Sequence, residues 1–517
     1  MKLLLPSLSA RAQGFSWLRH SALAFVCGAS CALGFAPIGW FLVPLLALAI
    51  LFGLWAHCRT RSAAVLTGFS FGLGLFLAAV SWVYVSMHVY GEMPAALAAL
   101  ATLLFCAYLA IFPAVAGWLV HYSARSTLFK LVVAGPAAFV LFEWIRSWLF
   151  TGFPWATLGY SQAPHSALVG YAALIGVFGV SWLLAVSGGL IALAWVVRRD
   201  AGWQVKTAVF AMLLAIWGGG LLLKQVSWSA PQGAPFSVAL LQGNVPQEQK
   251  WREEVRTATL EKYRTMALAS DARLIVFPET ALPLFFDQIP AAYLEELTQH
   301  AQQRGGDILL GSVERTRAEG KFDYFNAMIS VGSNRQQIYR KSHLVPFGEF
   351  IPWGFGWIIQ VLKIPLTDFA RGSLPQVPLE VAGQRVAVNI CYEDVFGDEI
   401  IRQLPAATLL VNTSNDAWYG ESFAADQHFQ ISQMRALETA RWMLRATNTG
   451  VTGVIDEQGR EVARLAQFKT ETLNAVAQGR SGVTPYVAAG NWPILVVLFA
   501  SLALSVLGKK RGNLNGE

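Results

Sequence analysis

The stretch Val386-Ala387-Val388-Asn389-Ile390-Cys391-Tyr392-Glu393 combines a buried strand with a thiol at its end. Residues Val386 to Ile390 are mostly β-branched or apolar, which predicts a strand inside a sheet. Cys391 follows this strand and is the only cysteine of residues 228–488, so no disulfide can form within that segment. A cysteine without a partner is either buried and inert or chemically active. Its place at a strand end makes Cys391 a candidate nucleophile.

The composition divides the chain into apolar segments and one soluble segment. Of the 517 residues, 55% are hydrophobic and only 14% are charged, against about 25% charged in ordinary globular proteins. Residues 228–488 contain 24 Lys and Arg and 28 Asp and Glu, a net charge of −4, although the whole chain carries +7. The other 15 of 39 basic and 4 of 32 acidic residues lie in the apolar segments. This distribution argues against nucleic acid as a partner and for a role in membrane topology.

Eight apolar runs are long enough to cross a bilayer as helices, which takes about 20 residues each. They lie near 20–36, 38–57, 63–86, 94–121, 128–150, 168–197, 205–225 and 491–508. Lys and Arg flank alternate connections, so the positive-inside rule predicts two cytoplasmic termini and a periplasmic soluble segment at the inner membrane. The expected division is seven transmembrane helices in 1–227, a periplasmic catalytic domain in 228–488, and an eighth helix with a cytoplasmic tail in 489–517.

Three features of the apolar part have alternative interpretations. Glu143 and Arg146 are spaced i, i+3, which favours a mutual ion pair over a functional intramembrane charge. The aromatic loop 151–162 is either an interfacial belt or part of a surface where lipid reaches the site. Gly68-Phe69-Ser70-Phe71-Gly72 fits the G-x-S-x-G pattern of hydrolases but follows no strand, so it indicates close helix packing rather than catalysis by Ser70.

Residues 228–488 alternate strand and helix patterns, which is typical of a layered α/β fold. The predicted strands are 235–242, 274–277, 308–313, 325–331, 336–340, 385–390 and 408–412. The predicted helices are 252–269, 293–303, 395–403 and 424–446, and a last hairpin turns at 457–459. Residues 350–370 interrupt this alternation with an aromatic, Gly-rich run, which favours a lid that touches lipid over a packed core segment.

Three polar motifs each follow a predicted strand. They are the run from Phe277 to Thr280, the run from Tyr339 to Glu349, and the run that holds Cys391. Since strand ends of an α/β sheet face one crevice, Glu279, Lys341 and Cys391 are expected to meet there. A carboxylate then takes the thiol proton, the thiolate attacks a carbonyl carbon, and the ammonium stabilises the oxyanion. Taken singly, these residues are more often a solvated carboxylate, a surface lysine and an inert thiol.

Residues 236–480 resemble the nitrilase, or carbon–nitrogen hydrolase, superfamily. The resemblance rests on the order Glu279, Lys341, Cys391 and on Leu344-Val345-Pro346-Phe347-Gly348-Glu349 after the lysine. With its apolar spans, the whole chain resembles the apolipoprotein N-acyltransferase family. Further matching stretches are Leu241-Gln242-Gly243-Asn244-Val245-Pro246-Gln247, Ser414-Asn415-Asp416-Ala417-Trp418-Tyr419-Gly420, Thr484-Pro485-Tyr486 and Gly490-Asn491-Trp492-Pro493. The implied fold is an α-helical membrane bundle of eight transmembrane helices plus an α/β nitrilase-like αββα sandwich.

The resemblance also implies roles for individual residues. Glu279 is the expected general base, Lys341 the oxyanion stabiliser and Cys391 the nucleophile. Glu349 is expected to orient Lys341 or to assist proton transfer. The other implied supporting residues are Tyr392, Glu393 and Asn326, and the implied lipid-binding tryptophans are Trp251 and Trp418. Ordinary core or interface packing is the alternative for each tryptophan.

The implied reaction is a two-step acyl transfer without a metal or cofactor. Cys391 takes an acyl chain from a phospholipid, with phosphatidylethanolamine as the expected donor, and forms a thioester. The α-amino group of a diacylglyceryl-modified N-terminal cysteine on an apolipoprotein then attacks this thioester. The protein is expected to act as a monomer. The eight histidines show no metal-ligand spacing such as H-E-x-x-H.

Two other functions compete with acyl transfer. A membrane-tethered amidase would use the same three residues, but a tether needs one span rather than eight. A transporter with a periplasmic binding domain would show internal repeats and polar groups near the bilayer midplane, and the sequence has neither.

Overall fold

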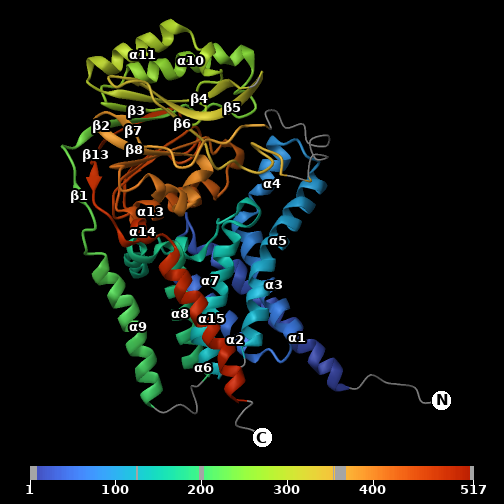
Figure 1. Ribbon diagram of the computed structural model, residues 1–517. Coiled ribbons are helices and arrows are strands. Elements are labelled where there is room, and N and C mark those ends of the chain that lie inside the picture. The colour runs from blue at the N-terminus through green and yellow to red at the C-terminus, as the bar shows by residue number, and fades with distance from the viewer. Residues whose placement is uncertain are drawn as a thin grey trace.

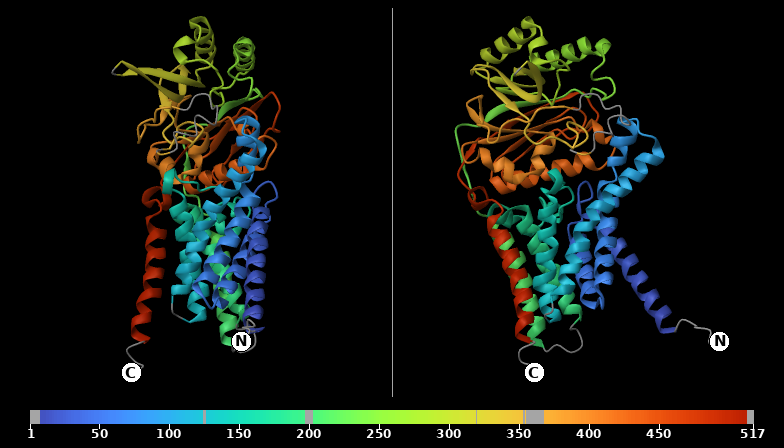
Figure 2. Two further views of the ribbon diagram at one scale, coloured as in Figure 1. Left: turned by 90° about the vertical axis from the view of Figure 1, so that its right-hand side faces the viewer. Right: turned by 45° about the vertical axis from the view of Figure 1, so that its right-hand side comes forward.

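The computed structural model describes residues 8–123, 126–196, 203–318, 320–352, 354 and 368–512. Figures 1 and 2 show two parts stacked along one axis. Long helices fill the lower part, and two sheets with their covering helices form the upper part. Helix α1 begins and helix α15 ends at the end of the bundle that lies away from the sheets (Figure 1). Most of the predicted lid, residues 350–370, lies outside the described residues.

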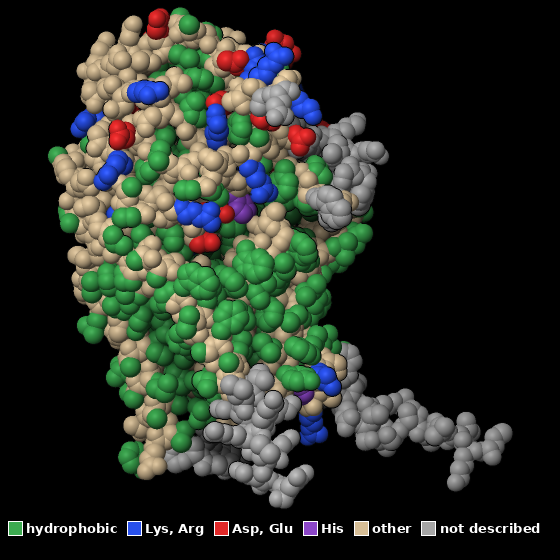
Figure 3. All heavy atoms as spheres, in the orientation of Figure 1, with side chains coloured by type: hydrophobic (Ala, Val, Ile, Leu, Met, Phe, Trp, Pro, Cys, Tyr) green, Lys and Arg blue, Asp and Glu red, His purple; other side chains and the backbone are tan. Residues whose placement is uncertain are grey.

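The bundle is built from apolar helices. Within the described residues, five helical segments are long and apolar enough to cross a membrane: Arg61–Val80, Ala95–Tyr122, Thr127–Arg146, Ala167–Val196 and Trp203–Leu223. Three shorter apolar helices are Leu18–Gly34, Leu42–His57 and Trp492–Ser505. The helices concerned are α1 Leu8–Ser30, α2 Leu42–His57, α3 Arg61–Val80, α5 Ala95–Tyr122, α7 Gly135–Arg146, α8 Ala172–Val196, α9 Trp203–Leu223 and α15 Trp492–Gly512. Hydrophobic side chains cover the lower half of the face in Figure 3, whereas charged side chains are concentrated on the upper half.

The Gly68–Gly72 run lies in the middle of α3 and packs against α5. A Cβ atom on Gly68 would lie 2.2 Å from the carbonyl oxygen of Pro113 in α5. Only glycine therefore permits this approach of the two backbones. The helix-packing interpretation of this run is confirmed, and no strand precedes Ser70 in the part of the chain that the structure describes.

Two six-stranded sheets form the upper part. The first has the order β13-β2-β3-β4-β5-β6 and the second has the order β12-β11-β10-β9-β8-β7. The first sheet comprises β2 Phe236–Gln242, β3 Leu274–Val276, β4 Asp307–Ala318, β5 Lys321–Gly332, β6 Ile338–Arg340 and β13 Glu471–Ala477. The second comprises β7 Leu379–Val381, β8 Gln384–Ile390, β9 Leu409–Ser414, β10 Met443–Thr447, β11 Gly453–Ile455 and β12 Glu461–Arg464. The centre of each sheet is parallel, β2-β3-β4 in one and β8-β9-β10 in the other.

Alternating side chains on the strands build four layers. Val238 and Leu240 of β2 share a core with Val386 and Val388 of β8, so these faces of the two sheets pack together. The opposite faces pack on helices. The first sheet is covered by α10 Glu253–Leu268 and α11 Ala291–Gln303, and the second by α13 Ala424–Thr439. The expected αββα sandwich is confirmed, with α13 on the side that faces the bundle (Figure 1).

One predicted helix is too long. The sequence pattern predicts helix over residues 424–446, but α13 ends at Thr439. Ala440 has φ of 50°, a left-handed conformation that stops the helix. Met443–Thr447 then forms β10, which pairs in parallel with β9. Pairing with a strand about 30 residues away therefore outweighs the local helical pattern.

Candidate active site

Three strand ends place the predicted residues at one edge of the sandwich. Glu279 follows β3 and Cys391 follows β8. Lys341 follows β6, which runs in the same direction as β3 because two antiparallel pairings separate β4 from β6. Side chains that leave parallel-running strands at their carboxyl ends meet in one region. The sheet topology therefore supplies the meeting point that the sequence predicts.

The ammonium of Lys341 lies between two carboxylates. Its Nζ atom is 3.3 Å from Oε1 of Glu279 and 2.9 Å from Oε1 of Glu349. Asn326 donates from Nδ2 to the same two oxygen atoms, at 2.7 and 3.1 Å. Burial alone would lower the pKa of Lys341, but the two carboxylates outweigh it and the pKa lies well above its usual value. Lys341 therefore stays charged near neutral pH.

Cys391 carries a neutral thiol in this resting arrangement. The residue is 9% exposed and has φ of 53°, a left-handed conformation that turns the chain sharply after β8. Burial, followed by the charge of Glu279, raises the pKa of the thiol well above its usual value. Lys341 acts in the opposite direction but does not outweigh them. A base must therefore take the thiol proton during the reaction.

Glu393 connects the turn of Cys391 to the turn of Lys341. Its Oε2 atom accepts hydrogen bonds from the backbone of Ile390 and from the Tyr339 hydroxyl, at 2.7 and 3.0 Å. Its Oε1 atom accepts from the backbone and hydroxyl of Ser342 and from the backbone of His343. One carboxylate thus satisfies donors on both turns. The structure places Glu393 as a positioning group rather than in the Lys341 cluster.

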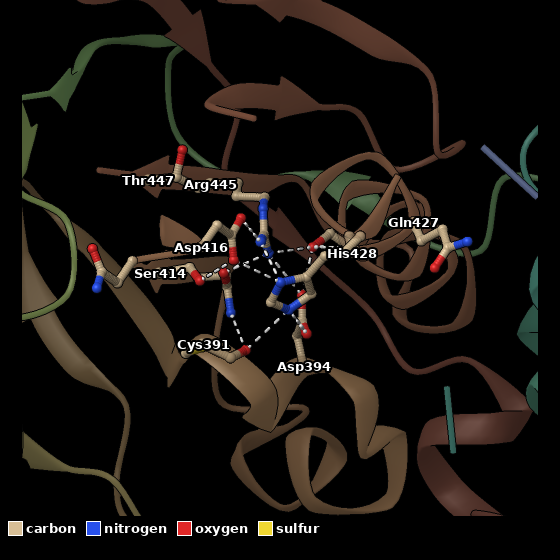
Figure 4. A network of polar contacts seen from close by, with 12 residues as sticks. Cys391, Asp394, Ser414, Asp416, Gln427, His428, Arg445 and Thr447 are labelled. Carbon is tan, nitrogen blue, oxygen red and sulfur yellow. Dashed lines mark hydrogen bonds and ion pairs between the residues drawn. The ribbon is translucent and has the colours of Figure 1, made fainter. Parts of the chain in front are cut away.

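A fully buried network of charged side chains contacts the backbone of Cys391 (Figure 4). Nε2 of His428 lies 2.7 Å from Asp394, and its Nδ1 lies 3.0 Å from Asp416. Arg445 pairs with the same two carboxylates at 3.1 and 2.9 Å. Nε2 of His428 also lies 3.3 Å from the carbonyl oxygen of Cys391. Such a buried network holds one geometry well when its members are paired, and it fixes the strained turn at Cys391.

Tyr392 ties the sandwich to the aromatic loop of the bundle. Its hydroxyl donates to the carbonyl oxygen of Gly152, at 3.2 Å. Its ring stacks at 6.5 Å on Trp155, which is itself only 1% exposed. Trp155 donates from Nε1 to Gln427 of α13 at 2.7 Å. An interfacial belt is therefore wrong for Trp155, because this ring is buried against Tyr392 and His428 instead of facing lipid.

Glu143 and Arg146 hold this loop instead of forming the predicted ion pair. Glu143 accepts from the backbone of Leu158 at 2.8 Å. Arg146 donates to the carbonyl oxygen of Trp155 at 2.7 Å and also to that of Phe153. Among the ion pairs of the described residues, none joins Glu143 to Arg146. Each of the two side chains is therefore paired with backbone groups of the loop and not with the other. Buried backbone N–H and carbonyl groups need such partners.

Trp251 and Trp418 are each 37% exposed. Trp418 lies in the turn Ala417–Tyr419 after β9. Its ring contacts Tyr90 at 6.0 Å, and its carbonyl oxygen accepts from the hydroxyl of Ser86 at 2.7 Å. Both partners belong to the segment that joins α3 to α5. Trp418 therefore sits where the sandwich meets the bundle, and Trp251 lies just before α10.

Lys250 is a buried cation that the sequence motifs do not single out. It is 2% exposed, and its Nζ donates to the hydroxyl of Thr280 at 2.7 Å and to the backbone oxygen of Glu279 at 3.1 Å. Burial lowers the pKa of Lys250 to about 8, and the charges of Glu279 and Cys391 oppose this shift. Lys250 thus lies beside the site and holds the turn that carries Glu279. The only sequence signal is its place directly before Trp251.

Within the described residues, no group of three His, Cys, Asp or Glu side chains is arranged to hold a metal ion. The polar groups of the site instead contact one another. The backbone N–H of Asn415 donates to Oε2 of Glu279 at 3.0 Å, and Asn415 also contacts Gln247 and Asn448 through its side chain. These contacts leave Glu279 oriented by three partners from different elements.

Comparison with known proteins identifies the family. Residues 27–190 match the family described as Apolipoprotein N-acyltransferase N-terminal domain, and residues 237–485 match the family described as Carbon-nitrogen hydrolase. A carbon-nitrogen hydrolase structure from Helicobacter pylori G27 matches 47% of this chain and 89% of its own, with 17% identity and a TM-score of 0.33. An apolipoprotein N-acyltransferase of Nitrosomonas europaea is 50% identical over 499 residues, covering 96% of this chain and 97% of that protein. One of Methylococcus capsulatus is 46% identical, covering 92% and 94%. Because this identity extends over nearly the full length, the chain belongs to the apolipoprotein N-acyltransferase family.

Proposed function

We propose that this protein transfers a fatty acyl chain from a membrane phospholipid to the α-amino group of an apolipoprotein, through a thioester on Cys391. The observation that carries the proposal is the buried Lys341 ammonium between Glu279 and Glu349, at the strand ends that also hold Cys391. The membership of this chain in the apolipoprotein N-acyltransferase family also supports acyl transfer. Phosphatidylethanolamine is the proposed donor, and a diacylglyceryl-modified N-terminal cysteine is the proposed acceptor.

In the first half-reaction, Glu279 takes the proton of the Cys391 thiol as the sulfur attacks the ester carbonyl of the phospholipid. Negative charge develops on the carbonyl oxygen, and the Lys341 ammonium stabilises it. Glu349 and Asn326 hold Lys341 and Glu279 in register for this step. When the intermediate collapses, the lysophospholipid oxygen takes the proton from Glu279 and leaves. The acyl chain remains on Cys391 as a thioester.

In the second half-reaction, the α-amino group of the apolipoprotein attacks the thioester carbonyl. Glu279 takes a proton from the attacking nitrogen, and Lys341 again stabilises the oxyanion. The thiolate leaves and recovers a proton, so the products are an N-acylated lipoprotein and free Cys391. Trp251 and Trp418 are proposed to contact acyl chains at the opening of the site. The buried aromatic side chains around Trp155 and Tyr392 favour aminolysis because they reduce access of water to the thioester.

The proposed placement puts all eight apolar helices across the inner membrane, with both termini cytoplasmic and the sandwich in the periplasm. The proposed division remains 1–227, 228–488 and 489–517, and the proposed state is a monomer. Both substrates are anchored in lipid, so a site directly above the bundle can reach each of them. Arg59 and Arg61, between the end of α2 and the start of α3, lie at the end of the bundle away from the sheets, and basic residues at that end support this orientation.

Trapping the acyl-enzyme tests the proposal. Incubating the full-length protein with phosphatidylethanolamine should add one acyl mass to Cys391, and hydroxylamine should remove it. A diacylated N-terminal peptide should then discharge the thioester and gain the third chain. Cys391→Ser should form no acyl-enzyme, because a serine hydroxyl at this site has no readily formed anion. Rapid release of free fatty acid without an acylated peptide would instead support the amidase or esterase alternative.

A further inference from the structure

A cavity lies away from Cys391, where α9 meets the sandwich. Its volume is about 750 Å³. Its walls are the loops at 36–39 and 163–165, the chain after α9 at 223–228, one face of α13, and the turn between β11 and β12. Gln430 and Gln433 of α13 line it, whereas His428 and Ser432 contact Asp394 on the other side of the same helix. Helix α13 therefore separates this cavity from the nucleophile.

The carboxylates that line the cavity are already paired. Asp426 contacts Arg464, and Glu461 lies 3.6 Å from the same guanidinium. Glu457 lies 3.1 Å from Arg480. The three carboxylates of the cavity thus pair with arginines from its own walls, two of them with Arg464, and none forms an ion pair with Lys224 or Arg460 in the described part of the chain.

Two cations of the cavity form no ion pair within the described residues, although the Asp456 carboxylate lies within electrostatic range of one of them, Arg460. Lys224 donates only to the carbonyl oxygen of Pro164, at 3.3 Å. The guanidinium of Arg460 forms no ion pair with a carboxylate in the described part of the chain. Lys224 and Arg460 also lie within electrostatic range of each other, and their charges repel. An anion between them would relieve this repulsion and satisfy both groups.

The surroundings of Lys224 indicate which anion fits. Lys224 directly follows α9, an apolar helix of 21 residues. Leu221, Leu222 and Val226 beside it are 56%, 73% and 43% exposed, so an apolar surface leads along α9 to the cavity. A ligand with a phosphate group and acyl chains matches both features. Free phosphate would use the two cations but not the apolar surface.

We propose that this cavity binds the headgroup phosphate of a membrane phospholipid, with Lys224 and Arg460 as its ligands and the acyl chains along the exposed face of α9. Arg460 can bind two phosphate oxygens, and Lys224 contributes a point charge. This lipid is distinct from the acyl donor, because α13 lies between the cavity and Cys391. The bound lipid would fill the cavity between α9 and the sandwich. The proposal does not depend on the acyl-transfer chemistry at Cys391.

The test uses the full-length protein in detergent. Short-chain dihexanoyl-phosphatidylglycerol and sodium phosphate are titrated separately at constant ionic strength, and binding is followed by thermal unfolding. Native mass spectrometry of protein purified from membranes reports any retained phospholipid. We expect the short-chain lipid to raise the unfolding temperature of the wild type, with no equal effect of phosphate. The double variant Lys224→Met/Arg460→Met should bind the lipid at least tenfold more weakly, since charge-assisted hydrogen bonds are the strong ones.

Two matched variants separate binding from folding. Lys321→Met/Arg335→Met removes the same charge from two exposed positions, one on β5 and one in the turn between β5 and β6, and should bind lipid like the wild type. Lys224→Arg/Arg460→Lys preserves both charges and should retain most of the affinity. Equal lipid affinity in Lys224→Met/Arg460→Met and the wild type would overturn the proposal. An equal response to sodium phosphate, with no retained phospholipid, would overturn the lipid as the source of the anion. Loss of binding in the charge-preserving variant would also contradict it.

Discussion

Replacing Lys250 by methionine should slow acylation of Cys391 with little loss of stability. Methionine keeps the length and apolar stem of the side chain but removes the ammonium. The ammonium holds the backbone oxygen of Glu279 and the hydroxyl of Thr280. Thr280 has φ of 42°, so the turn after β3 is held in a conformation that a non-glycine residue rarely adopts. Without this contact, the Glu279 carboxylate should lose its fixed position.

The effect on stability can be worked out from the pKa of Lys250. Burial lowers this pKa from 10.5 to about 8. Between these values the unfolded chain binds more protons, so stability falls as pH falls and the full cost is present below pH 8. A difference of about 2.5 between the two pKa values corresponds to about 3 kcal/mol. Methionine removes this cost but leaves two buried oxygens without a donor, at about 1–3 kcal/mol each. The two effects nearly cancel.

The effect on rate is larger, because an active-site displacement of about 1 Å can cost about 100-fold. We expect Lys250→Met to form the Cys391 thioester about 10- to 100-fold more slowly. The assay is single-turnover acylation by phosphatidylethanolamine, followed by mass spectrometry between pH 6.5 and 9.5. The wild-type rate should change near pH 8 as Lys250 loses the positive charge that it holds near Glu279, and the variant should lack this change. Lys321→Met, at an exposed position, is the matched control.

A second variant tests whether the contact with Thr280 is the cause. Thr280→Val keeps the shape of the side chain and removes only the hydroxyl. If Lys250 acts through this turn, the double variant Lys250→Met/Thr280→Val should be no slower than Lys250→Met alone. The reasoning would be refuted by a wild-type rate and pH profile in Lys250→Met. A large drop in its unfolding temperature would refute it equally, since Lys250 would then serve stability.

Three other predictions concern the remaining site residues. Glu393→Gln should lower both stability and thioester yield, because the new amide would direct its N–H₂ group at the Ile390 and Tyr339 donors; circular dichroism melting and acylation measured together check this, and unchanged values for both would contradict it. The thiol of Cys391, with its raised pKa, should react with iodoacetamide ever faster as pH rises through 9. A plateau below pH 7 would indicate a preformed thiolate instead. Lys341→Ala should slow both half-reactions in single-turnover assays, and an effect on phospholipid binding alone would disprove its oxyanion role.

Most of the fold could be predicted from local sequence patterns, that is, from the types of residue that follow one another in the chain. The strand from Val386 to Ile390 is buried as predicted, because β-branched and apolar side chains favour the inside of a sheet whatever the partner strand is. The apolar runs form helices for a similarly local reason, namely length and composition. The helix predicted to reach residue 446 failed where a distant strand competed for the same residues.

The sequence also indicated where a site would form but not how its parts touch. Glu279, Lys341 and Cys391 could be proposed because each follows a strand, and strand ends converge. Lys250 and His428 could not be predicted, because a buried lysine or histidine looks like any other until its partners are known. Lys250 reaches Glu279 and Thr280 across about 30 residues, and His428 reaches Asp394 across 34.

The thiol at the end of β8 shows the same division. Its strand, its lack of a cysteine partner in residues 228–488 and its distance in sequence from the two other motifs were all determined by the sequence. Only the tertiary structure decided that the thiol is neutral at rest, that Glu393 joins its turn to that of Lys341, and that Tyr392 reaches Gly152 of the bundle across 240 residues. The physical reason is that burial and charge around a group depend on residues that meet through folding and not through position in the chain.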